Sequence, residues 1–243
     1  MQNRLRAIGL RPISTLVDIT NFFTYDTNRP LHVFDADKLN GTSIRVHDAQ
    51  GGEKFSALDD KEYVLSKGMT VISDSEGIES LAGIMGGSAS GCTDTTENVF
   101  IEAAYFNPIR TAYTGRELKI NSDARYRFER GIDPEWTAFG IEAATKMIIE
   151  LCGGEPSNVV QAGEIPDHGR AYKVDTARIE SLVGMAIPPH KQLNILENLG
   201  FVIKGDTASV PSWRPDIQGE ADLVEEIARV VSLTKLEGTP LPR

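Results

Sequence analysis

The sequence is short of cysteine and has no long apolar run. Its two cysteines, Cys92 and Cys152, are too few for a disulfide framework or a cysteine-based zinc site, and we expect both to be reduced thiols. No stretch approaches the roughly 18 consecutive apolar residues of a membrane-spanning helix, so we expect no membrane span. Residues 1–12 lack the apolar centre of a secretory signal peptide. Their pattern is typical of a helix that continues from a preceding segment. We therefore expect a cytoplasmic piece of a longer protein.

Positive charge is also scarce. Lysine and arginine number 25 against 35 acidic residues, which gives a net charge of −10. Binding of nucleic acid by bulk attraction requires the opposite balance, so the composition argues against a protein that coats nucleic acid. A small basic group at Arg4, Arg6 and Arg11 leaves a local contact open. No P-loop pattern is present, which excludes that mode of nucleotide binding.

The apolar pattern of the chain is that of a globular protein with helices and strands. Helical spacing is found at 14–26 and 135–151, and strand-like alternation at 42–48 and 98–106, with a hairpin expected at Asp59–Asp60. These elements predict an α+β fold in which a mixed sheet-and-helix domain comes first.

A polar segment rich in glycine and proline, residues 163–171, predicts the domain boundary. The pattern after it is helix, helix, tight hairpin and helix, which resembles a small winged-helix-like module of the DNA-binding type. We therefore expect two domains, at residues 1–163 and 172–243.

Two side chains stand out as candidates for chemistry. Glu102 lies within the apolar run FIEAA, on the same face of its strand as Phe100 and Ala104. A buried carboxylate needs a partner or a function, and a core salt bridge to one of the nearby arginines is the alternative to a cavity. His32 lies within LHVFD, where a packed core histidine and a chemical role are both open.

Two further stretches have both a structural and a functional interpretation. The glycines of MGG, residues 85–87, allow either a sharp hairpin turn or a close ligand approach. The stretch RFERG contains Arg127, Glu129 and Arg130, and this alternation of charge is typical of a lattice of ion pairs at the surface or between elements.

Five stretches together carry a family resemblance. They are RPISTLVDITNFF at 11–23, RPLHVFDADKL at 29–39, LAGIMGG at 81–87, the segment 100–134 and VPSWRPDIQGEADLVEEIAR at 210–229. In wording and order they resemble the β subunit of bacterial phenylalanine–tRNA ligase, and the resemblance covers nearly the whole chain. It implies a B3/B4 editing domain followed by a B5 domain, within an aminoacyl-tRNA synthetase of protein biosynthesis.

The resemblance implies an editing site that hydrolyses tyrosine wrongly attached to the phenylalanine tRNA. Glu102 matches the family's reader of the tyrosine hydroxyl, and His32 matches its active-site histidine. The residues implied to line the same pocket are Thr20, Asn21, Gly86, Gly87, Ser122 and Ala124. Many family members have threonine where this chain has Ser122, so we expect a change of fit there and not of function. A covalent route is not expected, since no Ser-His-Asp or Cys-His arrangement is found.

A second implied site lies in the last predicted helix. Asp222, Glu225 and Glu226 share one helical side and Asp216 precedes it. Taken alone, this pattern is typical of a solvated acidic face, although carboxylates also suit Mg²⁺. The resemblance implies a Mg²⁺ site shared with the α subunit. We expect it to be empty without that partner.

The resemblance also implies partners that this chain lacks. The motifs for ATP and amino-acid activation belong to the α subunit of an α2β2 heterotetramer, so ATP is expected only in the whole enzyme and this chain alone should not charge tRNA(Phe). Three functions are weighed: an editing hydrolase with tyrosine as ligand, a non-catalytic module that braces the α subunit and tRNA, and a nucleic-acid-binding module. The net charge of −10 counts against the third.

Overall fold

The computed structural model describes residues 1–235, and the chain forms two compact units. The first is Met1–Ile165 and the second begins at Pro166. Helices and antiparallel sheets are present in both units, which confirms the α+β class. Of the predicted second domain, residues 236–243 lie outside the described residues.

The first unit holds most of the helices and strands. Its helices are α1 (Gln2–Ala7), α2 (Thr15–Asp26), α3 (Pro108–Glu117), α4 (Asp123–Phe128) and α5 (Trp136–Cys152), with a 3-10 turn at Ala36–Lys38. Its strands are β1 (Leu31–Asp35), β2 (Arg45–Asp48), β3 (Lys54–Ser56), β4 (Glu62–Val64), β5 (Thr70–Ser73), β6 (Ile78–Leu81), β7 (Met85–Gly86) and β8 (Val99–Ala103). The predicted helices at 14–26 and 135–151 and the hairpin at Asp59–Asp60 are confirmed, while the predicted strand at 98–106 is shorter.

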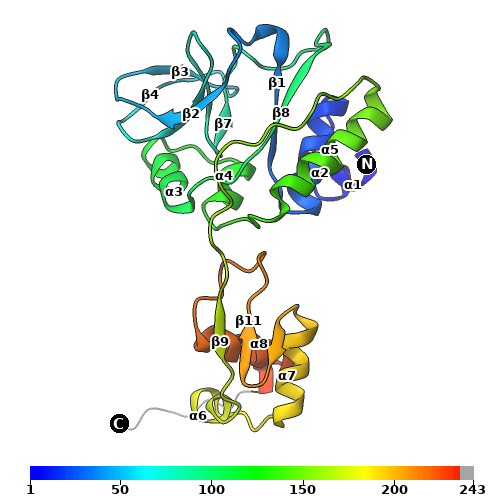
Figure 1. Cartoon of the computed structure of the whole chain (residues 1–243), viewed down its shortest axis with the longest axis vertical. Coiled ribbons are helices and arrows are strands. Elements are labelled where there is room, and N and C mark those ends of the chain that lie inside the picture. The colour runs from blue at the N-terminus through cyan, green and yellow to red at the C-terminus, as the bar shows by residue number, and fades with distance from the viewer. Residues whose placement is uncertain (236–243) are drawn as a thin grey trace. The chain divides into compact units, whose positions relative to one another are not determined.

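Strands β1 and β8 form an antiparallel pair that α2 and α5 cover (Figure 1). Helix α2 begins where the side chain of Ser14 accepts a hydrogen bond from the Val17 N–H, an N-cap that stabilises the first turn. Its apolar face buries Ile19 and Phe23 against Ala144 and Ile148 of α5. The two helices thus fix the β1–β8 pair from one side.

A four-stranded antiparallel sheet of order β2-β5-β6-β7 and the small hairpin β3-β4 form the other part of the unit. Figure 1 shows this part beside the β1–β8 pair, with α3 and α4 close by. A core that includes Phe34, Ile72, Ala82 and Phe128 joins β1, β5, the end of β6 and α4. The apolar residues that bring these elements together lie far apart in sequence.

Arg29 stabilises the chain just before β1. It is fully buried, one Nη donates to the Ala104 carbonyl at 2.9 Å and the other donates to the Asp133 carbonyl. A Cβ at Gly140 would come within 2.9 Å of the Arg29 Cγ, so the glycine of α5 leaves the room that this side chain needs. The buried guanidinium connects β1, β8 and the start of α5.

The second unit contains the helix, helix, hairpin and helix order predicted from the sequence. Its elements are β9 (Ala171–Lys173), α6 (Arg178–Val183), α7 (Pro189–Asn198), β10 (Val202–Lys204), β11 (Thr207–Ser209), α8 (Glu220–Val231) and a 3-10 turn at Leu233–Lys235. Strand β9, at the end of the predicted linker, adds to the hairpin in the order β10-β11-β9 and was not predicted. Ile179, Leu196, Ile217 and Leu223 are central to its core.

Two predictions about what the chain lacks can be compared with the described residues. No helix among residues 1–235 is long and apolar enough to cross a membrane. Both cysteines are free thiols, as predicted, and the Cys92 Sγ donates to the Val33 carbonyl at 3.6 Å.

Candidate active site

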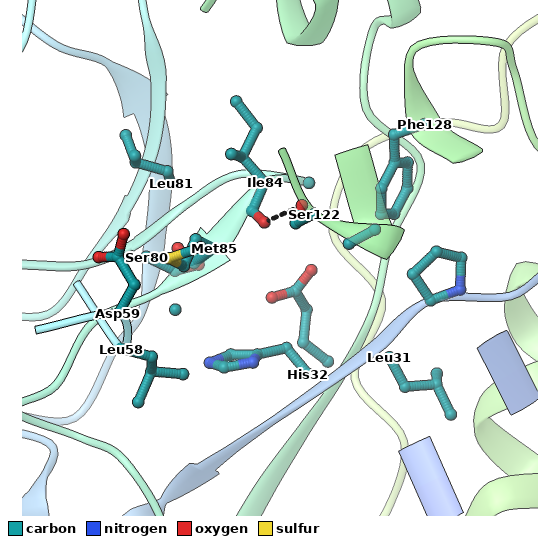
Figure 2. Close-up of a pocket in the computed structure, with 15 residues that line it drawn as sticks. Leu31, His32, Leu58, Asp59, Ser80, Leu81, Ile84, Met85, Ser122 and Phe128 are labelled. Carbon is teal, nitrogen blue, oxygen red and sulfur yellow. Dashed lines mark hydrogen bonds between the residues drawn. The ribbon is translucent and has the colours of Figure 1, made fainter. Parts of the chain in front are cut away.

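A cavity of about 330 Å³ lies in the first unit where the β1–β8 pair, the four-stranded sheet, the β3–β4 hairpin and α4 meet (Figure 2). Most of its wall is apolar. The lining residues are Pro30, Leu31, His32, Leu58, Asp59, Ser80, Leu81, Gly83, Ile84, Met85, Gly86, Glu102, Ser122, Ala124 and Phe128. Five of the residues expected at an editing site are therefore brought together: His32, Gly86, Glu102, Ser122 and Ala124.

His32 and Glu102 are direct partners in the β1–β8 register. Directly opposed residues of an antiparallel pair have Cβ atoms about 4.5–5.5 Å apart and project from the same face. Because this face forms part of the cavity wall, the imidazole and the carboxylate enter one hollow from neighbouring strands.

The described residues provide no ion pair for Glu102. Arg125 pairs with Glu129 at 2.9 Å, Arg127 pairs with Asp123, and Arg130 pairs with Glu129. The alternative of a core salt bridge to Glu102 is therefore wrong, whereas the predicted ion-pair lattice of RFERG is confirmed. Without a compensating cation, burial raises the pKa of Glu102 to about 7.

His32 is half-buried and packs edge-to-face on the buried ring of Phe34, with ring centroids 4.4 Å apart. Burial disfavours the imidazolium and lowers the pKa of His32 to about 4. The ring is therefore neutral at physiological pH, with one nitrogen able to donate a hydrogen bond and the other able to accept one.

Gly86 provides the space that the imidazole occupies. A Cβ at this position would lie 2.3 Å from the His32 Cε1 and 2.5 Å from its Nε2, so only glycine fits without a shift of the ring. Gly87 does not line the cavity, and its N–H donates to the Glu79 carbonyl at 2.7 Å. The MGG stretch pairs as β7 with β6, and its close approach is to a histidine of the same chain.

Ser122 and Ala124 reach the cavity from the start of α4. The Ser122 hydroxyl donates to the Ile84 carbonyl at 2.6 Å and accepts from the Arg125 N–H at 3.0 Å (Figure 2). It caps α4 and ties that helix to the segment before β7. Its hydrogen-bonding capacity is thus largely used within the protein, and its place at the cavity depends on this link.

Thr20 and Asn21 do not line the cavity. Both lie on α2, where the Thr20 hydroxyl donates to the Val17 carbonyl at 2.9 Å. Sequence reasoning missed Leu58, Asp59 and Met85, which enter the cavity from the β3–β4 turn and from β7. The ALDD turn was predicted, but nothing in a local pattern indicates which distant strands a turn will touch.

The four predicted Mg²⁺ ligands do not form a cluster. Arg214 binds Asp216 at 2.6 Å and Glu226 at 3.1 Å, and Arg229 also binds Glu226. Asp222 accepts from the Gln218 N–H at 2.7 Å, and Glu225 is exposed. No group of three or more possible metal ligands occurs among the described residues. The predicted ligand set does not fit a metal here, because two of its carboxylates are neutralised by arginines.

The comparison with known proteins agrees with these two units. Residues 1–153 match the B3/4 domain family, and residues 172–232 match the tRNA synthetase B5 domain family. The chain belongs to the B3/4 domain family and is similar along its whole length to phenylalanine–tRNA ligase β subunits. The resemblance predicted from the sequence is thereby confirmed.

Close relatives of this chain are found among phenylalanine–tRNA ligase β subunits. Those of Ruegeria pomeroyi and Cereibacter sphaeroides are 65% and 62% identical over 243 residues, and that of Paramagnetospirillum magneticum is 51% identical over 247 residues. All of this chain is covered in each case, but it spans only about 30% of the relatives' length.

A solved structure also resembles this chain. It is an N-terminal fragment of the phenylalanyl-tRNA synthetase β subunit from Pyrococcus horikoshii, with 18% identity and a TM-score of 0.41 over 87% of this chain and 64% of that chain.

Proposed function

We propose that the cavity of the first unit hydrolyses tyrosine wrongly esterified to the phenylalanine tRNA. The observation that carries the proposal is the carboxylate of Glu102 in a mostly apolar cavity without a cation partner. Cavities of about 300 Å³ and more accept small molecules, and the leucine, methionine and phenylalanine side chains here suit an aromatic ring.

The chemical need for such a site follows from the two amino acids. An apolar pocket rejects an added hydroxyl only weakly, by roughly 10²-fold. A site that hydrogen-bonds the hydroxyl rejects the analogue without it by about 10⁴–10⁵-fold, because phenylalanine would leave the buried polar group unpaired. In the proposed complex the phenol O–H donates to Glu102.

The proposed reaction is hydrolysis of an ester by water. The water oxygen bonds to the carbonyl carbon and the bond to the ribose oxygen breaks. The ribose oxygen leaves as a hydroxyl with one proton from the water, and the second proton is released when the new carboxylic acid ionises. Neutral His32 is placed to hold the water by a hydrogen bond. With its pKa near 4 it is a weak proton acceptor, so a ribose hydroxyl of the tRNA is the alternative route for the proton.

The oxyanion that develops on the carbonyl needs a donor. The Gly87 N–H already donates to the Glu79 carbonyl, so it is not free to donate to the oxyanion. The imidazole N–H of His32 and a tRNA hydroxyl are the remaining candidates.

For the whole protein we infer the α2β2 heterotetramer, in the cytoplasm, with ATP bound at the α subunit and tRNA(Phe) as substrate. Any Mg²⁺ at α8 would need ligands from the partner as well as release of Asp216 and Glu226 from Arg214. The alternative is a non-catalytic module that braces the α subunit and tRNA.

The decisive experiment follows deacylation of Tyr-tRNA(Phe) and Phe-tRNA(Phe) in parallel with the whole enzyme. Faster loss of the tyrosyl ester, abolished in Glu102→Ala and unchanged in the exposed matched control Glu97→Gln, supports the proposal. Equal rates for both esters, or full tyrosyl hydrolysis in Glu102→Ala, overturn it in favour of the bracing module.

The part played by His32 is tested separately. His32→Ala should slow tyrosyl hydrolysis strongly, and His32→Gln should restore part of it if the ring only positions the water. If activity does not change in His32→Ala, the histidine has no part in the chemistry. A rate that follows an ionisation near pH 4 would identify it as the base.

A further inference from the structure

The charge of the cavity lining is one-sided. Of the fifteen residues that line it, three titrate, namely His32, Asp59 and Glu102, and none is a lysine or an arginine. His32 is neutral at physiological pH and burial keeps Glu102 partly protonated. The wall thus contains carboxylates but no cation that could pair with a negatively charged ligand.

Asp59 is the one of these three titratable lining residues that the proposed reaction does not use. It lies in the turn between β3 and β4, and Figure 2 shows it across the cavity from Phe128. Its Oδ2 accepts from the Tyr63 hydroxyl at 2.7 Å and from the Lys61 Nζ at 3.1 Å. The hydrogen bond from Tyr63 and those from Lys61 lower the pKa of Asp59, so it is ionised at neutral pH.

These contacts hold the Asp59 carboxylate in place without using all of its capacity. Two oxygens offer about four acceptor sites, and among residues 1–235 Oδ1 accepts only from the Lys61 backbone N–H at 3.3 Å. The Lys61 side chain is 70% exposed and approaches from solvent, so it can move aside for another cation.

We propose that Asp59 binds the α-ammonium group of the aminoacyl ester and makes the cavity selective for esters over free amino acids. The inference rests on the proposed function and adds its substrate class. An amino-acid ester presents an ammonium and no carboxylate, which matches this wall. The free amino acid adds a carboxylate that finds no cation in the lining and is repelled by Asp59. Hydrolysis therefore turns a ligand that fits into a product that leaves.

The test measures binding of three phenols, and of phenylalanine amide, which lacks the phenol hydroxyl, by calorimetry at pH 6.5, where the amine is protonated. Tyrosine amide has an ammonium and a neutral carbonyl group, tyrosine has an ammonium and a carboxylate, and 3-(4-hydroxyphenyl)propanamide has neither charge. The wild-type chain should bind tyrosine amide about tenfold or more tightly than each of the others, in keeping with the strength of a hydrogen bond between charged groups.

Asp59→Asn should abolish the preference for tyrosine amide over the propanamide and leave propanamide binding unchanged, which also shows that the variant is folded. The matched control is Asp60→Asn, which removes the same charge from the next residue. Asp60 is exposed, does not line the cavity and has φ 61°, a conformation that asparagine tolerates. This control should bind all three ligands like the wild type.

Two outcomes overturn the inference alone. One is a wild type that prefers tyrosine amide to phenylalanine amide while Asp59→Asn keeps the full preference for the ammonium. The other is tight binding of free tyrosine that is lost in Lys61→Gln, because Lys61 would then hold the carboxylate. If the wild type does not distinguish tyrosine amide from phenylalanine amide, the proposed function itself fails and this inference falls with it.

Discussion

His32 on β1 lies directly opposite Glu102 on β8 in the antiparallel register. The same apolar surroundings lower the pKa of the base to about 4 and raise the pKa of the acid to about 7. Near neutral pH the pair therefore consists of an uncharged imidazole and a carboxyl group that is close to its midpoint. Small changes in pH or in bound ligand alter the charge of Glu102 and leave His32 unchanged.

Binding of a phenol should depend on pH through Glu102. The ionised carboxylate accepts a stronger hydrogen bond than the acid, so affinity should rise as pH increases from 6 to 8, by about tenfold for a midpoint near 7. Calorimetry with 3-(4-hydroxyphenyl)propanamide, which does not titrate in this range, measures it. His32 and Asp59 also line the cavity, but neither titrates between pH 6 and 8. Glu102→Gln should give a flat profile, and a sloping one would assign the dependence to another group.

The free energy of unfolding should show that burial of the Glu102 carboxylate is destabilising. The pKa of Glu102 is raised in the folded state, so its contribution to stability falls as pH rises from about 4.5 to about 7. Glu102→Gln should therefore be more stable than the wild type at pH 8, by about 1–3 kcal/mol, with the difference shrinking at pH 5. Urea unfolding in a Trp213→Phe background, with Trp136 as reporter, measures it. Equal stability at pH 8 would mean that the carboxylate is well solvated.

Gly86→Ala should damage the site without unfolding the protein. The new Cβ would lie 2.3 Å from the His32 ring, so the imidazole must move. A displacement of about 1 Å can cost roughly 10²-fold in rate, and we expect a loss of that order in tyrosyl-tRNA hydrolysis. Gly77→Ala is the matched control, since nothing lies within 4 Å of its Cβ. Full activity in Gly86→Ala would show that the position of His32 is not critical.

Ser122→Ala should loosen α4. It removes the N-cap of that helix and the hydrogen bond to the Ile84 carbonyl, and we expect a loss of about 1–2 kcal/mol in the free energy of unfolding. Ser122→Thr keeps the hydroxyl and should retain most of this stability. The same urea titrations compare the two variants, and an equal loss in both would show that the hydroxyl contributes nothing.

Arg214→Ala should destabilise the second unit. Arg214 binds both Asp216 and the buried Glu226, and removal of one partner of a buried pair is costly, so we expect about 2–4 kcal/mol. The control is Arg178→Ala, whose pair with Glu220 is largely exposed and worth less than about 1 kcal/mol. Unfolding followed by Trp213 fluorescence in a Trp136→Phe background reports on this unit. Equal losses in the two variants would show that the ion pairs of Arg214 contribute no more to stability than the exposed pair of Arg178.

The sequence pattern correctly predicted those helices and turns that neighbouring residues determine. The apolar spacing and Ser14 cap of α2, the long apolar stripe of α5 and the ALDD turn are all confirmed because neighbouring residues determine them. The small strand β9 was missed because three residues carry too little pattern to stand out. The sequence left open whether a nearby arginine forms an ion pair with Glu102, because the choice of an ion-pair partner depends on contacts between distant segments.

By itself, the sequence determined the α+β class, the helices α2 and α5, the helix, helix, hairpin and helix order of the second unit, the family and five residues that line one cavity. Only the tertiary structure decided that His32 faces Glu102 across a strand pair, that Gly86 makes room for the imidazole and that Asp59 joins them. It also decided that Glu226 of α8 forms ion pairs with Arg214 and Arg229, and that Asp216 before α8 pairs with Arg214. The reason is physical: helix and strand preferences act between near neighbours, whereas the charge, burial and partners of a side chain depend on which distant segments pack against it.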